Sequence, residues 1–226
     1  MKDQVYRVVS VLAIASYFIP LLIVVFRKLL SERAFVFFSF YWLTGGLVNI
    51  LDYLGLKKSL IQTINVVYNM IDVPFIMAIF YFTTSSKALR KFILISGIPY
   101  VFVEAYLAIT GGLYYDTFKY ALGAGIVIVI TMILWEIVSY LKKMHHSAKQ
   151  RVLIFIYAAL LFEYGTFIVI YIFDYFVIAT DTRDNFLIYY ISSLIGVAIA
   201  SVGLMGKKAR QQKPTWKKRE QIVTII

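Results

Sequence analysis

Apolar runs of about 20 residues, separated by short polar loops, recur along the whole sequence. A bilayer core about 30 Å thick is crossed by about 20 apolar helical residues, and the alternation typical of membrane β-barrels is absent. Hydrophobic residues make up 61% of the 226 residues and charged residues only 15%, whereas soluble domains have about 25% charged residues. The sequence therefore predicts an all-α integral membrane bundle of seven transmembrane helices, over residues 8–26, 34–54, 60–83, 92–112, 119–141, 152–178 and 186–205.

The positions of lysine and arginine predict how this bundle is oriented. Cytoplasmic loops carry an excess of these residues. Seven spans divide the loops between two sides, and 17 of the 23 Lys and Arg residues fall on the side that includes the C-terminal tail. The N-terminus is therefore expected outside, and the C-terminus in the cytoplasm, of a cell or inner membrane. This arrangement requires an odd number of spans.

A basic tail, residues 207–226, follows the transmembrane domain, residues 1–206. Trp216 lies among the basic residues of the tail, which suits an anionic lipid surface, where each Lys or Arg contributes about 1 kcal/mol. The net charge of +11 therefore needs no nucleic acid. The expected partners are the lipid bilayer and its anionic lipids, and the alternative is a cytoplasmic or membrane protein docked on the tail.

Motifs of catalysis and cofactor binding are absent from the sequence. It contains no cysteine, which excludes disulfides, thiol nucleophiles and thiolate metal sites. It also lacks a Gly-x-Ser-x-Gly elbow, a Walker loop, a dinucleotide fingerprint and the Gly-x-Gly-Asp motif of intramembrane aspartyl proteases. We expect a protein that is not an enzyme and that holds no cofactor and no metal.

Two of the predicted spans align without gaps at an offset of 120 residues. The second and sixth spans also both end in an acid followed by tyrosine, at Asp52 and Asp174. These matches indicate a 3+1+3 parallel repeat, in which one span joins two triplets, or chance similarity between apolar segments. The matched residues are Asn65, Ile71, Ala78, Ile79, Lys87 and Arg90 in the first segment and Asn185, Ile191, Ala198, Ile199, Lys207 and Arg210 in the second.

A 3+1+3 plan resembles the organisation of the SWEET and PQ-loop transporters and of the microbial rhodopsins, which implies a site at the repeat interface. The chain departs from both groups. Ala198 stands about where the retinal-binding lysine of rhodopsins falls, and no Pro-Gln pair is present, so retinal binding is not expected. Residues 68–72, together with the overall length, are similar to a group of uncharacterised seven-helix bacterial membrane proteins, which implies a fold but no activity.

Six acidic residues lie inside the predicted spans, and no Lys, Arg or His lies at membrane depth to pair with them. An acid at the bilayer centre costs about 2.5–3.5 kcal/mol on insertion and is therefore a candidate functional residue. Burial without a cation favours the neutral form of such a group. Asp72 and Glu163 are expected near mid-membrane and Glu104 in the outer half. The six acids are Asp52, Asp72, Glu104, Glu136, Glu163 and Asp174.

Polar residues share helix faces with these acids. Asn65, Asn69 and Asp72 are spaced i, i+4 and i+7 and so share one face of the third span. Several such faces open towards the outer half, which predicts a cavity accessible from outside, and the alternative is interhelical packing through small and amide residues. The candidate proton- or ligand-binding residues are Asp72, Glu163, Glu104, Asn65, Asn69 and Asp52.

A proline follows the central acid of the third span. The ring of Pro74, two residues after Asp72, frees the carbonyl oxygen of Met70 from its helical hydrogen bond. An open carbonyl beside an acid can bind a cation or pass a proton. Tyrosines within the spans either line a pocket or simply pack, and the candidates for a pocket are Tyr68, Tyr100, Tyr164 and Tyr171.

These features predict transport of a small solute or cation. Asp72 and Glu163 would couple transport to protons by alternating between protonated and ionised forms, while Asn65 and Asn69 supply hydrogen bonds to the ligand. One alternative is a seven-helix sensory receptor, with an outward-facing ligand cavity and a cytoplasmic partner. Another is a structural subunit of a membrane complex.

Overall fold

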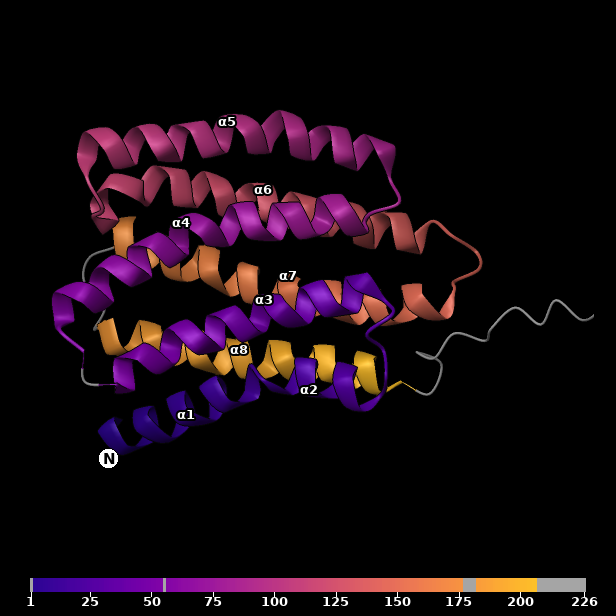
Figure 1. The fold of residues 1–226 in the computed structure, drawn as a ribbon, viewed down its shortest axis with the longest axis horizontal. Coiled ribbons are helices and arrows are strands. Elements are labelled where there is room, and N and C mark those ends of the chain that lie inside the picture. The colour runs from indigo at the N-terminus through magenta and orange to yellow at the C-terminus, as the bar shows by residue number, and fades with distance from the viewer. Residues whose placement is uncertain (1, 55, 177–181, 207–226) are drawn as a thin grey trace, which may run out of the picture.

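The computed structural model describes residues 2–54, 56–176 and 182–206, and helices dominate these ranges (Figure 1). The predicted all-α class is confirmed. The basic tail, residues 207–226, lies outside the described residues, so its contact with anionic lipids stays a prediction. The helices are α1 (Lys2–Ser16), α2 (Ile19–Phe26), α3 (Arg33–Ile50), the short 3₁₀ helix η1 (Leu51–Tyr53), α4 (Lys58–Thr83), α5 (Lys87–Gly111), α6 (Tyr115–Leu141), α7 (Ala148–Phe176) and α8 (Thr182–Met205).

The first predicted span, residues 8–26, is broken into two helices. Helix α1 ends at Ser16 and α2 begins at Ile19. Pro20 causes this break, because it has no N–H to donate to the carbonyl of Ser16 and its ring clashes with that carbonyl in a continuous helix. The hydroxyl of Ser16 turns back to the carbonyl of Ala13, at 2.7 Å. The predicted first span is thus present as the apolar segment Gln4–Phe26, but it contains a break at its middle.

Six helical segments are long and apolar enough to cross a membrane, by length and composition. The chain is thus an integral membrane protein that lies in a lipid bilayer. Helix α3 corresponds to the predicted span 34–54 but is not one of the six. The six segments are Gln4–Phe26, Lys58–Thr83, Lys87–Gly111, Tyr115–Leu141, Ala148–Asp174 and Phe186–Met205.

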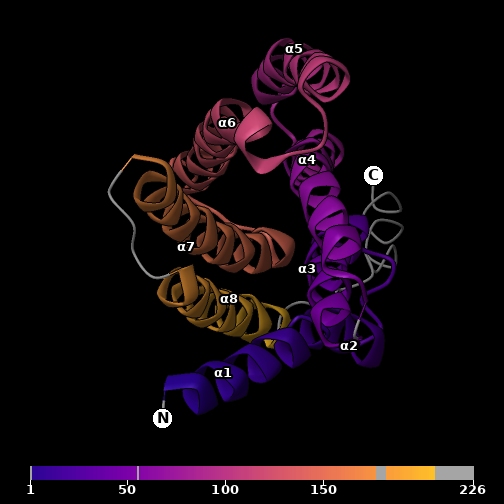
Figure 2. The same ribbon diagram turned by 90° about the vertical axis from the view of Figure 1, so that its left-hand side faces the viewer.

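The helices form a bundle with two sides (Figure 2). Helices α1, α8, α7 and α6 make up one side, and α2, α3 and α4 make up the other. Helix α5 is outermost and packs against α4 and α6. Helices α3 and α7 therefore face each other across the interior, and large side chains fill the space between them.

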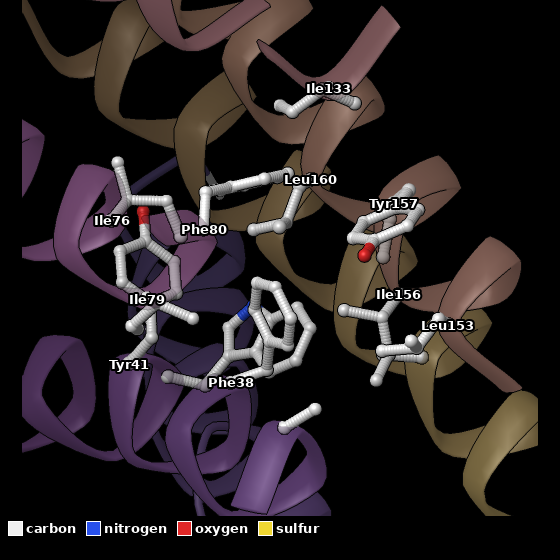
Figure 3. Close-up of a cluster of buried hydrophobic side chains, with 14 of the residues drawn as sticks. Phe38, Tyr41, Ile76, Ile79, Phe80, Ile133, Leu153, Ile156, Tyr157 and Leu160 are labelled. Carbon is white, nitrogen blue, oxygen red and sulfur yellow. The ribbon is translucent and has the colours of Figure 1, made fainter. Parts of the chain in front are cut away.

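Aromatic side chains join the two sides at the centre (Figure 3). Phe38 of α3 meets Phe80 of α4 edge to face, with ring centroids 5.6 Å apart. Phe80 stacks on Tyr157 of α7 at 5.5 Å. Such pairs contribute about 0.5–1.5 kcal/mol beyond the area that they bury. Close packing of this kind stabilises helix association in a bilayer, where lipid tails are as apolar as the side chains.

The outer surface of the bundle is apolar, as lipid contact requires. Helix α5 shows this most clearly, since 71% of Phe102 and 85% of Ile109 are exposed. A water-soluble monomer rarely exposes contiguous apolar surface of this extent. The apolar residues of α5 therefore divide between a narrow face towards α4 and α6 and a wide face towards lipid.

The N-terminus and the end of α8 lie at opposite ends of the bundle (Figure 1). The loops α2–α3, α4–α5 and α6–α7 lie at the same end as the last residues of α8. At this end Glu32 forms an ion pair with Lys149, with Oε2 and Nζ 3.2 Å apart. Which end faces the cytoplasm stays a prediction. The 3+1+3 repeat is not shown by the structure, and the side chain of its matched Asn185 lies outside the described residues.

Candidate functional site

Glu163 lies near the middle of α7, buried between α3 and α8. Only 2% of its surface is exposed. The indole N–H of Trp42, on α3, donates to both carboxyl oxygens, Oε1 at 3.0 Å and Oε2 at 3.1 Å. Gly196 of α8 closes the other side, since a Cβ added there would lie 2.5 Å from Oε1. The carboxyl is thus held between an indole ring and a glycine backbone.

Asp72 of α4 is half-buried and lies beside a group of tyrosines. The hydroxyl of Tyr164 donates to its Oδ2 at 2.8 Å, and the hydroxyl of Tyr41 donates to that of Tyr164 at 3.0 Å. Tyr41 and Tyr68 also lie close enough to influence the Asp72 carboxyl. Gly45 of α3 leaves space for Tyr68, whose hydroxyl would lie 3.1 Å from a Cβ at that position. Phenols from α3, α4 and α7 therefore converge on this acid.

Consecutive residues of α7 connect the two acids. Glu163 contacts Trp42 of α3, and Tyr164 contacts Asp72 of α4. Within the ranges that the structure describes, no Lys, Arg or His forms an ion pair with either carboxyl. The hydrogen-bond donors to both acids are neutral N–H and O–H groups. We call Trp42, Glu163, Asp72, Tyr164 and Tyr41 the central cluster.

A second group of hydrogen bonds lies between the break in the first span and α8. The hydroxyl of Tyr17, in the turn between α1 and α2, bonds with Ser193 at 2.6 Å and with Tyr189 at 3.0 Å. The amide of Asn49, on α3, donates weakly to Tyr189 at 3.4 Å and accepts from Tyr190 at 3.3 Å. These bonds tie α1, α3 and α8 together beside the central cluster.

Glu104 and Asn69 do not join the central cluster. They line a separate small cavity of about 10 Å³ between α4, α5 and α6. This volume is at the lower limit of the space that one water molecule needs. Asn65 lies one turn earlier on α4 and does not line this cavity. The predicted polar face of Asn65, Asn69 and Asp72 is therefore divided: Asn69 lines the cavity, whereas Asp72 belongs to the central cluster.

The other predicted acids lie away from both the central cluster and the small cavity. The side chain of Asp52 lies outside the described residues. Glu136 accepts a hydrogen bond from Thr84 near the end of α6. Asp174 is exposed near the end of α7. Across the described ranges no three His, Cys, Asp or Glu side chains come together in a way that could hold a metal ion.

Sequence reasoning missed Trp42, Tyr41 and Tyr17 as candidate residues. Trp and Tyr are common in membrane proteins at the two interfaces with water. Trp42 and Tyr41, however, stand near the middle of the predicted span 34–54, where an indole or phenol must find a buried partner. Their depth in the membrane was the signal that could have identified them. Their partners on α7 could not be identified from the sequence, because the contact depends on how α3 and α7 are placed in the bundle.

Comparison of the chain with family profiles, with curated proteins and with solved structures finds no match. The similarities to transporters, rhodopsins and uncharacterised bacterial proteins noted in the sequence therefore identify no family. The function must be argued from the central cluster and its surroundings.

Proposed function

We propose that the protein is a proton-coupled transporter of a small solute or cation, with Glu163 and Asp72 as its proton-binding groups. The observation that carries the proposal is a pair of carboxyls in the centre of the bundle whose hydrogen-bond partners are neutral. An ionised carboxylate is costly in a low-dielectric interior unless it is paired or takes up a proton. Both acids are therefore suited to change charge by binding and releasing protons.

Proton binding to Glu163 changes the contact between α7 and α3. The Trp42 N–H now bonds with both carboxyl oxygens. A proton on one oxygen turns that oxygen into a hydrogen-bond donor and leaves the other as the acceptor for the indole. The bond between α3 and α7 is then weaker, which links the protonation of Glu163 to the packing of two helices.

The same argument applies to Asp72 and the contact between α7 and α4. The ionised carboxyl accepts from Tyr164, whereas a protonated carboxyl also carries an O–H that needs an acceptor of its own. Two negative charges in one low-dielectric cluster repel each other, so the acids bind protons as a coupled pair. Proton uptake is therefore coupled to the contacts of α7 with both α3 and α4.

The break in the first span supports the transport proposal. Discontinuous helices near the middle of the bilayer are typical of secondary transporters, in which they lie next to the site. Here the turn at Tyr17 bonds with Ser193 of α8, three residues before the Gly196 that packs on Glu163. The proposal includes α3 as a seventh span and the predicted orientation, with the N-terminus outside.

Proton flux into proteoliposomes tests this proposal. The vesicles enclose a pH-sensitive dye, and an inward proton gradient is imposed with Na⁺, K⁺ or a mixture of sugars and amino acids on one side. We expect proton uptake that depends on at least one of these solutes. Glu163→Gln and Asp72→Asn remove the titrating groups with little change of shape, and each should lower the flux at least about tenfold.

A matched control is Asp116→Asn. It removes an exposed carboxyl in the first turn of α6, far from the central cluster, and its flux should equal that of the parent. Thermal unfolding in detergent checks that every variant is folded. Absence of flux from folded parent protein, or full flux in both cluster variants, would overturn the proposal.

A further inference from the structure

Three hydroxyl groups form a chain between the central cluster and the end of the bundle at which α8 begins. The hydroxyl oxygen of Tyr17 lies 3.0 Å from that of Tyr189 and 2.6 Å from that of Ser193. Tyr189 is partly exposed, only 4% of Tyr17 is exposed, and Ser193 is fully buried. We call these three groups the hydroxyl chain, and their burial increases towards the middle of the bundle.

The inner end of the hydroxyl chain lies next to the carboxyl of Glu163. Ser193 and Gly196 are three residues apart and therefore share one face of α8, and a Cβ on Gly196 would lie 2.5 Å from Oε1 of Glu163. Tyr17 and Tyr189 also lie close enough to influence this carboxyl electrostatically. The remaining step, from Ser193 to the carboxyl, is about one helical turn or about 5 Å along the helix. One water molecule can bridge a step of this size.

Hydroxyl groups at these distances can pass a proton along. Each hydroxyl both donates and accepts a hydrogen bond, and bonds between two hydroxyls span about 2.5–3.0 Å. Each oxygen takes a proton from one neighbour as its own proton passes to the next, so a proton moves inward and no residue gains or loses an atom overall. The O–H groups then rotate back. The longer contacts of Asn49, at 3.4 and 3.3 Å, are too weak to extend this chain.

Aromatic rings close the opposite side of the central cluster (Figure 3). Phe38 lies four residues before Trp42 on α3, and Phe80 lies eight residues after Asp72 on α4. Both are therefore displaced towards the end at which α3 begins and α4 ends, opposite to the hydroxyl chain (Figure 1). Phe38 and Phe80 are fully buried, and neither has a polar atom that could carry a proton. This asymmetry favours proton access from the end at which α8 begins.

We infer that protons reach Glu163 from the end of the bundle at which α8 begins, through the hydroxyls of Tyr189, Tyr17 and Ser193 and one bridging water molecule. The inference rests on one part of the proposed function, namely that Glu163 binds protons, and it adds the route that the protons take. Loss of one hydroxyl from the chain should slow proton binding and leave the equilibrium between the two charge states unchanged.

Trp42 can report the arrival of a proton at Glu163. Its indole N–H bonds with both carboxyl oxygens, so its fluorescence should change when the carboxyl becomes neutral. The sequence contains three tryptophans, and Trp135→Phe with Trp216→Phe leaves Trp42 as the only one. The full chain in detergent is mixed rapidly with acidic buffer, and the fluorescence is followed in time. Glu163→Gln should abolish the signal, whereas Asp72→Asn should retain it, which assigns the signal to Glu163.

The pH range of the jump separates the carboxyls from the phenols near them. Phenols ordinarily ionise at about pH 10, so a jump that stays below this range leaves them protonated throughout. Asp72 is then the other acid of the central cluster that can titrate, and its variant controls for it. The phenols concerned are those of Tyr17, Tyr41, Tyr68, Tyr164 and Tyr189.

Two variants interrupt the hydroxyl chain, and a third is the matched control. Tyr17→Phe and Ser193→Ala should each slow the Trp42 signal at least about tenfold and leave its pH midpoint unchanged. Ser192→Ala removes a neighbouring hydroxyl of α8 that is buried and has no hydrogen-bond partner among the described residues. Its rate should equal that of the parent. Thermal unfolding checks that each variant is folded.

The possible results separate the route from the proposed function. A pH-dependent Trp42 signal with equal rates in the parent, Tyr17→Phe and Ser193→Ala would overturn the inference and leave proton binding by Glu163 in place. The same slowing in Ser192→Ala would also overturn it, because the effect would then come from packing in α8. Absence of any signal in the folded parent would overturn both the inference and the role of Glu163 in transport. Slower proton binding in the two chain variants alone supports the route, whether or not flux is found.

Discussion

Gly196 decides how closely α8 approaches the carboxyl of Glu163. A Cβ at this position would lie 2.5 Å from Oε1, 2.7 Å from Cγ and 2.8 Å from Cδ. Real side chains do not approach this closely, so an alanine there forces α8 and α7 apart or moves the carboxyl away from Trp42. The glycine is therefore part of the central arrangement although it has no side chain.

Gly196→Ala should lower the free energy of unfolding by about 1–3 kcal/mol, because the added methyl overpacks the contact with Glu163. Chemical unfolding in detergent micelles measures this. Combining it with Glu163→Ala removes the clash, so the two changes together should cost less than their sum. Additive costs would show that the methyl does not meet the carboxyl.

Gly165→Ala supplies the matched control on α7. A Cβ there has no neighbour within 4 Å, and alanine favours a helix over glycine by about 1 kcal/mol. Stability should stay unchanged or rise. A loss as large as that of Gly196→Ala would mean that glycine loss in these helices is costly in general.

For single residues, the sequence predicts the depth of an acid in the membrane but not its contacts. The depth and isolation of Asp72 and Glu163 are readable from hydropathy, because an acid stands out in an apolar run. Their contacts are not readable, because Trp42 and Tyr164 resemble ordinary apolar packing until α3, α4 and α7 are placed. Spacing on one helix placed Asn69 with Asp72, yet the side chain of Asn69 lines the cavity with Glu104.

At the level of helices, the broken first span is held in place by α8. Tyr17 lies in the turn between α1 and α2, and its hydroxyl bonds with Ser193 and Tyr189. The sequence showed Pro20 inside the predicted span 8–26, but not where the helix would break. A proline is tolerated in membrane helices when side chains nearby satisfy the freed backbone, so its presence alone did not reveal a break.

Tyr17→Phe should lower the free energy of unfolding by about 1 kcal/mol, since it leaves the buried hydroxyl of Ser193 without this partner. The same change at Tyr106, which is exposed on α5, should cost nothing measurable. Both variants are compared by chemical unfolding in detergent. Equal stability of Tyr17→Phe and the parent would contradict a structural role for the contact between this turn and α8.

At the level of the whole molecule, loops alternate between two ends, and the basic loops lie at the end where α8 finishes (Figure 1). Hydropathy predicted the helices well, because each crossing needs a long apolar run. Hydropathy was less informative for α3, because the polar aromatic residues Tyr41 and Trp42 of this helix are buried in the interior of the bundle. The orientation stays a prediction from the distribution of charge, and it can be measured directly.

The absence of cysteine allows single cysteines to report that orientation. Ser59→Cys, at the start of α4, and Met144→Cys, in the loop after α6, are both exposed. In intact cells a membrane-impermeant maleimide should label position 59, whereas position 144 should react only after permeabilisation. The reverse pattern would contradict the predicted orientation, and labelling of both from outside would contradict an odd number of crossings between the two positions.

The adjacency of Glu163 and Tyr164 makes α7 sensitive to rotation about its own axis. Successive residues of an α-helix point about 100° apart, so one side chain is directed at α3 and the next at α4. A rotation of α7 about its axis therefore changes two hydrogen bonds at once, the one between Glu163 and Trp42 and the one between Tyr164 and Asp72. If the proposed proton binding takes place, a change of charge on either acid would therefore act on the rotation of the whole helix, from the central cluster to the loop at its basic end.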